Sequence, residues 1–136
     1  AVHSVGRMRG EVAEFFSTQF LYDDPTLVVT ATSGVIDQQG RPFTHGAEVY
    51  FEKATLLFES FTETPLTVLD AEGNVTKPEL GSPDILDSFP AELEEAVQSV
   101  ENNTPSALLD GALARDALVL AHKQTQSIVE RKAVDV

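Results

Sequence analysis

Short runs of β-branched and aromatic residues, separated by turn-forming residues, fill the first 70 positions of the chain. The breaks fall at Gly10, Asp23-Asp24-Pro25, Gln38-Gln39-Gly40 and Thr64-Pro65. Such runs between such breaks are typical of β-strands and hairpins. We predict strands over about 1–8, 13–22, 26–36, 47–53, 55–61 and 65–70, with residues 75–80 as a candidate for one more. Because the connections are short, the strands should pair as an antiparallel meander rather than as βαβ units.

The predicted strands carry apolar side chains on both faces. In the second strand, Phe16, Thr18, Phe20 and Tyr22 alternate with Phe15, Ser17, Gln19 and Leu21. An antiparallel sheet with one face in water normally alternates apolar and polar residues cleanly. We therefore expect one broad open sheet, with helices of this chain on one face and a second subunit or domain on the other. The plainer alternative is a small sheet with scattered exposed apolar residues.

Helical patterns occupy residues 88–132. Asp87 or Ser88 can cap a first helix that has Pro90 in its first turn. The apolar stripe of this helix is Phe89, Leu93, Val97 and Val100, and Asn102-Asn103-Thr104-Pro105 ends it. A second, longer helix is predicted from about 107 or 111 to 131, and residues 133–136 are predicted to return to the sheet as an edge strand. The predicted fold is a single α+β domain over 1–136, with its sheet at about 1–80, helices at about 88–132 and a final strand at 133–136.

The charge of the chain excludes some partners. Its 22 Asp and Glu outnumber nine Lys and Arg, which gives a net charge of -13. A phosphate backbone or an anionic membrane would be repelled, so we expect neither nucleic acid nor membrane as a partner. No apolar run approaches the roughly 18 residues that span a bilayer, and the first residues do not have the layout of a signal peptide. These features favour a cytoplasmic location.

The motifs that mark most catalysts are missing. The sequence contains no G-x-G-x-x-G, no G-x-x-x-x-G-K-[ST] and no G-x-S-x-G, which present phosphates or a nucleophile. The chain has no cysteine, and its histidines, His3, His45 and His122, lie far apart and form no H-E-x-x-H pair. We therefore expect no catalytic residue, no metal site and no cofactor site on this chain.

One loop is a candidate for substrate contacts. Arg41 and His45 lie in the segment 41–46 between two predicted strands, where functional groups are often displayed. An arginine and a histidine can bind hydroxyls or a carboxylate. The plainer interpretation of His45 is an exposed loop histidine, and a self-contained hydrolase that pairs His45 with an acid is a further alternative.

Several short motifs, in order along the chain, resemble those of a known family. The first is Val49-Tyr50-Phe51-Glu52-Lys53-Ala54-Thr55-Leu56, and the later ones are Phe89-Pro90-Ala91-Glu92-Leu93, Asn103-Thr104-Pro105, Ala112-Leu113-Ala114-Arg115-Asp116-Ala117-Leu118, Ser127 and Val134 to Val136. Together they resemble the C-terminal domain of the glucose-fructose oxidoreductase and inositol dehydrogenase (Gfo/Idh/MocA) family. Phe51 and Ala54 stand where that family usually has glycines.

The resemblance implies a fold and a role. The family joins an N-terminal Rossmann domain, which binds NAD or NADP and holds a catalytic Glu-Lys-Pro motif, to a C-terminal domain with an open sheet. Here the Rossmann domain would lie upstream of Ala1, which agrees with a chain whose only methionine is Met8. This chain would wall the substrate cleft and form a homodimer through the open sheet face. The parent enzyme would be an oxidoreductase for a sugar, a polyol or a related small molecule. The alternative is an independent α+β protein-interaction or scaffold domain.

Overall fold

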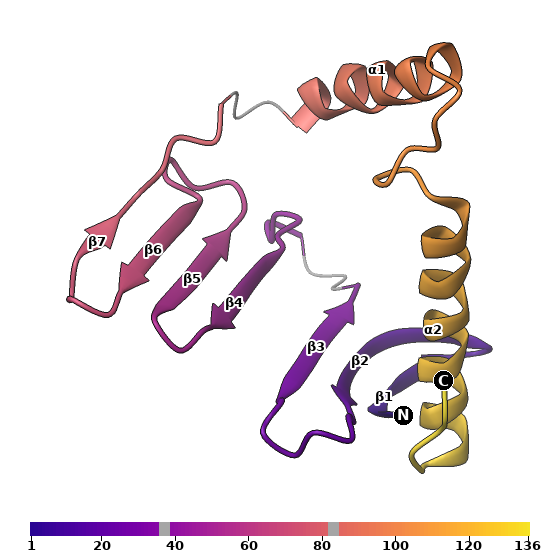
Figure 1. Ribbon diagram of the computed structural model, residues 1–136. Coiled ribbons are helices and arrows are strands. Elements are labelled where there is room, and N and C mark those ends of the chain that lie inside the picture. The colour runs from indigo at the N-terminus through magenta and orange to yellow at the C-terminus, as the bar shows by residue number, and fades with distance from the viewer. Residues whose placement is uncertain (36–38, 82–84) are drawn as a thin grey trace. The chain divides into compact units, whose positions relative to one another are not determined.

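The computed structural model describes residues 1–35, 39–81 and 85–136 (Figure 1). Its strands come first along the chain and its helices follow, with loops between them. The described residues form seven strands in two antiparallel sheets and two α-helices. This confirms the predicted α+β class. The chain divides into two compact units, unit 1 being Ala1–Gln39 with Ser99–Val136 and unit 2 being Gly40–Gln98. The interpretation of 1–136 as a single domain stays a prediction.

Unit 1 contains a three-stranded antiparallel sheet in the order β1-β2-β3. Its strands are β1 (Val2–Arg9), β2 (Val12–Phe20) and β3 (Val29–Gly34). A tight turn joins β1 to β2, and Gly10 takes a φ of 63° there, a left-handed conformation that glycine adopts without steric cost. These strands lie within or close to the predicted ranges, because β-branched and aromatic runs between turn residues give a local signal.

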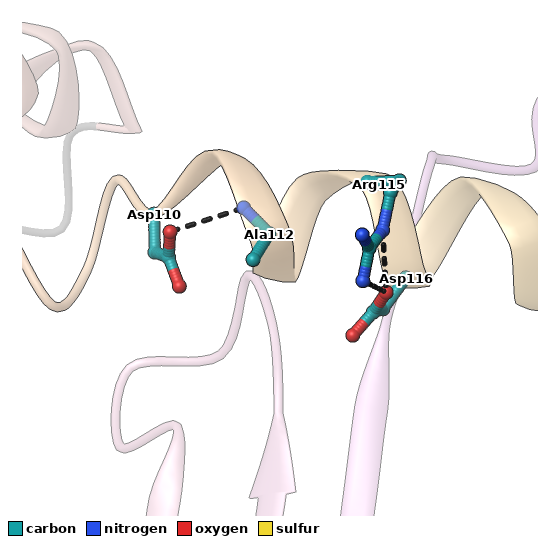
Figure 2. A network of polar contacts seen from close by, with 4 residues as sticks. All are labelled: Asp110, Ala112, Arg115 and Asp116. Atoms are coloured by element: carbon teal, nitrogen blue, oxygen red, sulfur yellow. Dashed lines mark hydrogen bonds and ion pairs between the residues drawn. The ribbon is translucent and has the colours of Figure 1, made fainter.

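The helix α2 (Gly111–Glu130) packs against β1 and β2. It begins at the later of the two predicted starts, because the Asp110 side chain accepts a hydrogen bond from the Ala112 amide at 3.0 Å and so caps the helix (Figure 2). One turn further on, the Arg115 guanidinium contacts the Asp116 carboxylate on the outside of the helix. The helix ends at Arg131, which has a φ of 54°.

Hydroxyl groups join α2 to the sheet. Ser4, Thr18 and Ser127 are almost fully buried. The Ser4 and Thr18 hydroxyls lie 2.7 Å apart, and the Gln124 amide donates to the Thr18 oxygen at 3.0 Å. Ser127 Oγ accepts the Ser4 backbone N–H at 2.8 Å and donates to the Lys132 carbonyl at 2.6 Å. This polar seam satisfies the buried groups, as burial requires.

The apolar core beside this seam is small. The buried hydrophobic residues among those described are Val2, Ile128 and Val134. Val2 and Val134 exchange two backbone hydrogen bonds of 2.9 Å as an antiparallel bridge. The predicted final strand over 133–136 is therefore reduced to one bridging residue. This bridge and the Ser127 side chain both make hydrogen bonds to backbone groups at the outer edge of β1.

Unit 2 contains a four-stranded antiparallel sheet in the order β4-β5-β6-β7. Its strands are β4 (Gly46–Tyr50), β5 (Ala54–Glu59), β6 (Leu66–Asp70) and β7 (Val75–Thr76). The strands thus form two sheets, and the expectation of one broad sheet was wrong. In the segment before β4, Gly40 takes a φ of 90°, and Pro42 has no N–H to donate to a strand ladder.

One face of the second sheet is apolar. The register places Val49, Leu56 and Val68 side by side, and Ala47, Phe58 and Leu66 form the next row on the same side. We call these six side chains the apolar sheet face. All six are exposed or half-buried, and among the described residues of unit 2 no helix packs against this sheet. The opposite face mixes polar and apolar side chains, which include Glu48, Tyr50, Thr55, Leu57, Thr67 and Leu69.

The helix α1 (Ser88–Glu101) follows a short 3₁₀ turn at Ile85–Asp87. It begins at one of the two predicted caps, and it ends where predicted. There Asn103 takes a φ of 47°, and the Ser99 hydroxyl donates to the Thr104 carbonyl at 2.7 Å. No residue of α1 is buried, so its predicted apolar stripe is exposed; Val100 is 80% exposed.

Candidate functional site

A pocket of about 440 Å³ lies within unit 2, at one end of the apolar sheet face. The end of β5, the loop that joins β5 to β6 and the segment after β7 supply its walls. The lining residues are His45, Phe58, residues 60–65 and residues 77–81. Its volume is in the range of small-molecule sites in proteins.

Backbone hydrogen bonds fix His45 at the edge of this pocket. Its N–H donates to the Ser60 hydroxyl at 2.8 Å, and its carbonyl accepts the Ser60 N–H at 2.9 Å. Both bonds lie next to the terminal ladder pair of β4 and β5, Gly46 and Glu59. Ser60 is buried, so this end of the hairpin is anchored. The His45 side chain, two positions before Ala47, therefore lies on the side of the apolar sheet face.

Three phenylalanine rings surround the imidazole of His45. The ring centroid of Phe58 is 5.6 Å from that of His45, and those of Phe43 and Phe61 are 6.0 Å and 6.2 Å away. Phe61 meets the imidazole edge to face at 86°. Aromatic pairs at such separations attract one another through their quadrupoles. The imidazole thus lies near three rings, and His45 itself is exposed in the loop before β4, as the plainer interpretation expects.

The loop that carries Phe61 is held by its own backbone. The Glu59 N–H donates to the Pro65 carbonyl at 2.9 Å, and the Thr62 hydroxyl donates to the Glu59 carbonyl at 3.0 Å. Phe61 takes a φ of 61°, a left-handed conformation that is uncommon for a bulky residue. This conformation leaves the Phe61 ring 60% exposed beside the pocket.

Besides Pro65, Pro78, Leu80 and Gly81, polar side chains line the pocket. They are Thr62, Glu63, Thr64, Lys77 and Glu79. This set includes two carboxyl groups, one amino group and two hydroxyls. The set can donate and accept hydrogen bonds. It does not include an activated nucleophile, because the Ser60 oxygen is engaged by the His45 backbone amide rather than by its imidazole.

The structure separates the two residues predicted to contact substrate. His45 lines the pocket, whereas Arg41 is exposed in the preceding loop and is not part of the lining. Both assignments stay predictions. Sequence reasoning missed Phe58, Phe61, Lys77 and Glu79. Residues 77–81 approach His45 through the pairing of β5, β6 and β7. The sequence predicts the meander of these strands, but it does not indicate that the segment after β7 lies beside His45.

Other charged groups support local structure. The Asn74 side-chain amide donates to the Asp70 carboxylate at 2.8 Å and lowers the pKa of Asp70. The Tyr50 hydroxyl donates to the Glu48 carboxylate, which raises the pKa of Tyr50. Among residues 1–35, 39–81 and 85–136, no group of three or more His, Asp or Glu is placed to hold a metal ion. In the same part of the chain, neither helix combines the length and the apolar content needed to cross a membrane.

Comparison with known proteins found no family model, no curated protein and no solved structure that matches the chain. The kinship with the Gfo/Idh/MocA family therefore stays a prediction from the sequence motifs.

Proposed function

We propose that this chain is the substrate-cleft and dimerisation domain of an NAD(P)-dependent oxidoreductase of the Gfo/Idh/MocA type. Its substrate would be a sugar, a polyol or a related small molecule. NAD or NADP would be bound by an N-terminal Rossmann domain, so this chain alone would not be catalytically competent. The observation that carries the proposal is the apolar sheet face of unit 2, against which no described helix of that unit packs. The ordered motifs of the sequence supply the link to the oxidoreductase family.

The apolar sheet face supports an assembly role. An antiparallel sheet tolerates water on a polar face, whereas an apolar face is stable only when another surface covers it. Val49 on this face is 41% exposed, and its neighbours Leu56 and Val68 are half-buried. A second copy of the chain would remove these side chains from water.

The proposed reaction is hydride transfer between a carbinol carbon of the substrate and the nicotinamide ring. The nicotinamide supplies the hydride chemistry, and the protein orients the substrate against it. In this division of labour the chain described here contributes a wall of the cleft. Arg41 and His45 are the residues that we propose as substrate contacts on that wall.

Sedimentation velocity tests the assembly role. We expect the chain to sediment at twice its 14.7 kDa mass, through an interface that buries about 1,600 Å² or more. Val49→Lys places a charge on the apolar sheet face and should shift the equilibrium to monomer. The matched control is Val75→Lys, because Val75 lies opposite Leu69 on the other face and is 62% exposed. A wild-type chain that stays monomeric at all concentrations would instead favour the interaction-domain alternative.

The oxidoreductase assignment has a separate test. The coding sequence upstream of Ala1 should encode a G-x-G-x-x-G that follows a strand and opens a helix. Calorimetric titration of this chain alone with NAD or NADP should give no binding heat. Tight dinucleotide binding by the isolated chain would contradict the division of roles between two domains.

A further inference from the structure

The outer edge of β3 is open. This strand lies at the end of the order β1-β2-β3, and among the described residues no strand pairs with its other side. The Val35 N–H donates to the Glu14 carbonyl at 2.9 Å, so these two residues form a hydrogen-bonded pair of the β2–β3 ladder. Such pairs recur at every second residue of an antiparallel ladder. The backbone N–H and C=O groups of Thr30, Thr32 and Gly34 therefore point away from β2.

The strand β3 lacks the features that protect sheet edges. Proteins usually protect an edge with charged residues, prolines, bulges or very short strands. Residues 25–36 contain no Asp, Glu, Lys or Arg, β3 has no proline, and its register with β2 is continuous. The other sheet edges are different, because β1 is bridged by Val134, β4 carries Glu48 and β7 has two residues. The edge of β3 is thus suited to accept a further strand.

The side chains of β3 determine which strand fits beside it. Val29, Ala31 and Ser33 share the sheet face on which Thr18 is buried. The helix α2 packs against β1 and β2, whereas no described residue of α2 packs against β3, and Ala31 and Ser33 are exposed. Directly opposite residues of paired strands share a face. Small apolar side chains of an added strand would therefore lie beside Ala31 and Ser33.

The charge of the chain favours a basic partner. Asp23 and Asp24 lie in the loop that leads into β3, and this loop has no basic residue. In a chain with a net charge of -13, these carboxylates add to a field that attracts cations. A strand that continues the antiparallel order of the sheet would have its C-terminal end at this loop. Lys or Arg residues at that end would face Asp23 and Asp24.

We propose that the edge of β3 binds an extended segment of a basic partner protein by β-strand addition. The bound segment is uncharged and rich in β-branched residues over about five positions, the length of a typical strand, and it has Lys or Arg at its C-terminal end. Main-chain hydrogen bonds supply the affinity, and the basic end sets the direction of the segment. This interaction goes beyond the oxidoreductase role, since β3 belongs to unit 1 and the apolar sheet face belongs to unit 2.

Fluorescence anisotropy with labelled synthetic peptides tests the proposal. The probe is the peptide TVTVTKK, and its matched partners are TVTVTEE and KKTVTVT. We expect TVTVTKK to bind. At low salt the other two should bind at least about threefold more weakly, because their lysines are replaced by acids or moved to the end away from Asp23 and Asp24.

Matched substitutions of Thr32 identify the edge. Thr32→Pro removes an N–H that points away from β2, so it should keep the fold and weaken binding of TVTVTKK at least about tenfold. Thr32→Val is the control, because it removes the hydroxyl that donates to Ser17 Oγ at 3.2 Å and keeps the N–H. Circular dichroism of both variants checks that the fold is kept.

Amide exchange by NMR tests the unaltered chain. Addition of TVTVTKK should slow exchange of the Thr30, Thr32 and Gly34 amides about tenfold, since pairing takes them out of water. Glu48 is the reference. The Phe51 N–H donates to the Ala54 carbonyl in the β4–β5 ladder, so by alternation the Glu48 N–H points away from β5, and its exchange should not change.

Three results would overturn the proposal. The first is equal binding of the three peptides or no binding of TVTVTKK, and the second is an equal effect of Thr32→Pro and Thr32→Val. The third is slow exchange of the Thr32 amide before any peptide is added. If that slow exchange depends on protein concentration, a second copy covers the edge, and if it does not, another strand of the same chain covers it. None of these results bears on the dimer through the apolar sheet face, which Val49→Lys tests.

Discussion

Ser127 joins three segments of unit 1 through one hydroxyl group. It is fully buried and links the Ser4 amide of β1 to the Lys132 carbonyl beyond α2. Ser127→Ala removes the hydroxyl and leaves both backbone groups without this partner. We expect the free energy of unfolding to fall by about 1–3 kcal/mol, the cost of a buried unpaired polar group. Chemical denaturation measures this loss.

The control for that variant is Ser33→Ala. Ser33 is exposed on β3, where the same substitution should change stability by less than about 0.5 kcal/mol. Equal effects at Ser33 and Ser127 would show that the seam contributes nothing beyond strand and helix propensity.

Gly6 is required by the close approach of two strands. A Cβ at this position would lie 2.4 Å from the Phe16 Cβ and 2.5 Å from the Phe15 carbonyl oxygen. We expect Gly6→Ala to lower the free energy of unfolding by about 1–3 kcal/mol, because backbone atoms must move to make room. Gly111→Ala should act in the opposite direction, since nothing lies within 4 Å of its Cβ position and alanine favours a helix. Thermal unfolding of both variants gives the two signs.

At the scale of single elements, the stability of the turn between β6 and β7 depends on pH. Asp70 accepts hydrogen bonds from the Asn74 side chain and from the Asn74 and Glu72 amides, and these lower its pKa. A carboxylate whose pKa is lower in the folded than in the unfolded state stabilises the folded state at pH values above its unfolded-state pKa. That stabilisation is lost as the pH falls through the folded pKa.

The Asn74→Ala variant tests this account of the turn. Removal of the side-chain amide should raise the pKa of Asp70, as measured by carboxyl NMR titration. Thr26→Ala is the matched control, since Thr26 lowers the pKa of Asp24 in another turn and its loss should leave Asp70 unchanged. An unchanged pKa of Asp70 in Asn74→Ala would contradict the assigned cause.

The elements and the antiparallel pairing of consecutive strands were largely predictable from the sequence, and the division of the strands into two sheets was not. Runs of β-branched residues located β1 to β6, and the spacing of apolar residues located α1 and α2. The face of β2 with Thr18 and Phe20 is the more buried one, whereas Phe15 on the other face is 42% exposed. The division into two sheets falls between β3 and β4, and the spacing of the predicted strands does not indicate it.

The pocket illustrates the same limit. His45 was identified because a histidine in a loop between strands is a common functional feature. The left-handed backbone of Phe61 and the approach of Lys77 depend on the β5–β6 loop and on the pairing of β7. The sequence predicts the meander that includes β7, but the φ of Phe61 leaves no pattern in the adjacent sequence. The position of Phe61 beside His45 therefore required the structure.

At the scale of the whole molecule, exposed apolar surface makes stability depend on association. If two copies cover the apolar sheet face, unfolding must also separate them, and the midpoint temperature should rise with protein concentration. Scanning calorimetry over a hundredfold range of concentration measures this. Val49→Lys should abolish the concentration dependence, and Val75→Lys should keep it. A midpoint that is independent of concentration in all three proteins would argue for a stable monomer.

The closure of β1 by residues from the other end of the chain has a consequence for biosynthesis. Ser4 and its partner Ser127 are 123 positions apart, so at usual translation rates about 6 to 25 s pass between their additions to the nascent chain. Unit 2 is translated in between and can fold first. During this delay the nascent chain offers an open strand edge next to the ribosome, where a chaperone that recognises extended peptides would have time to bind.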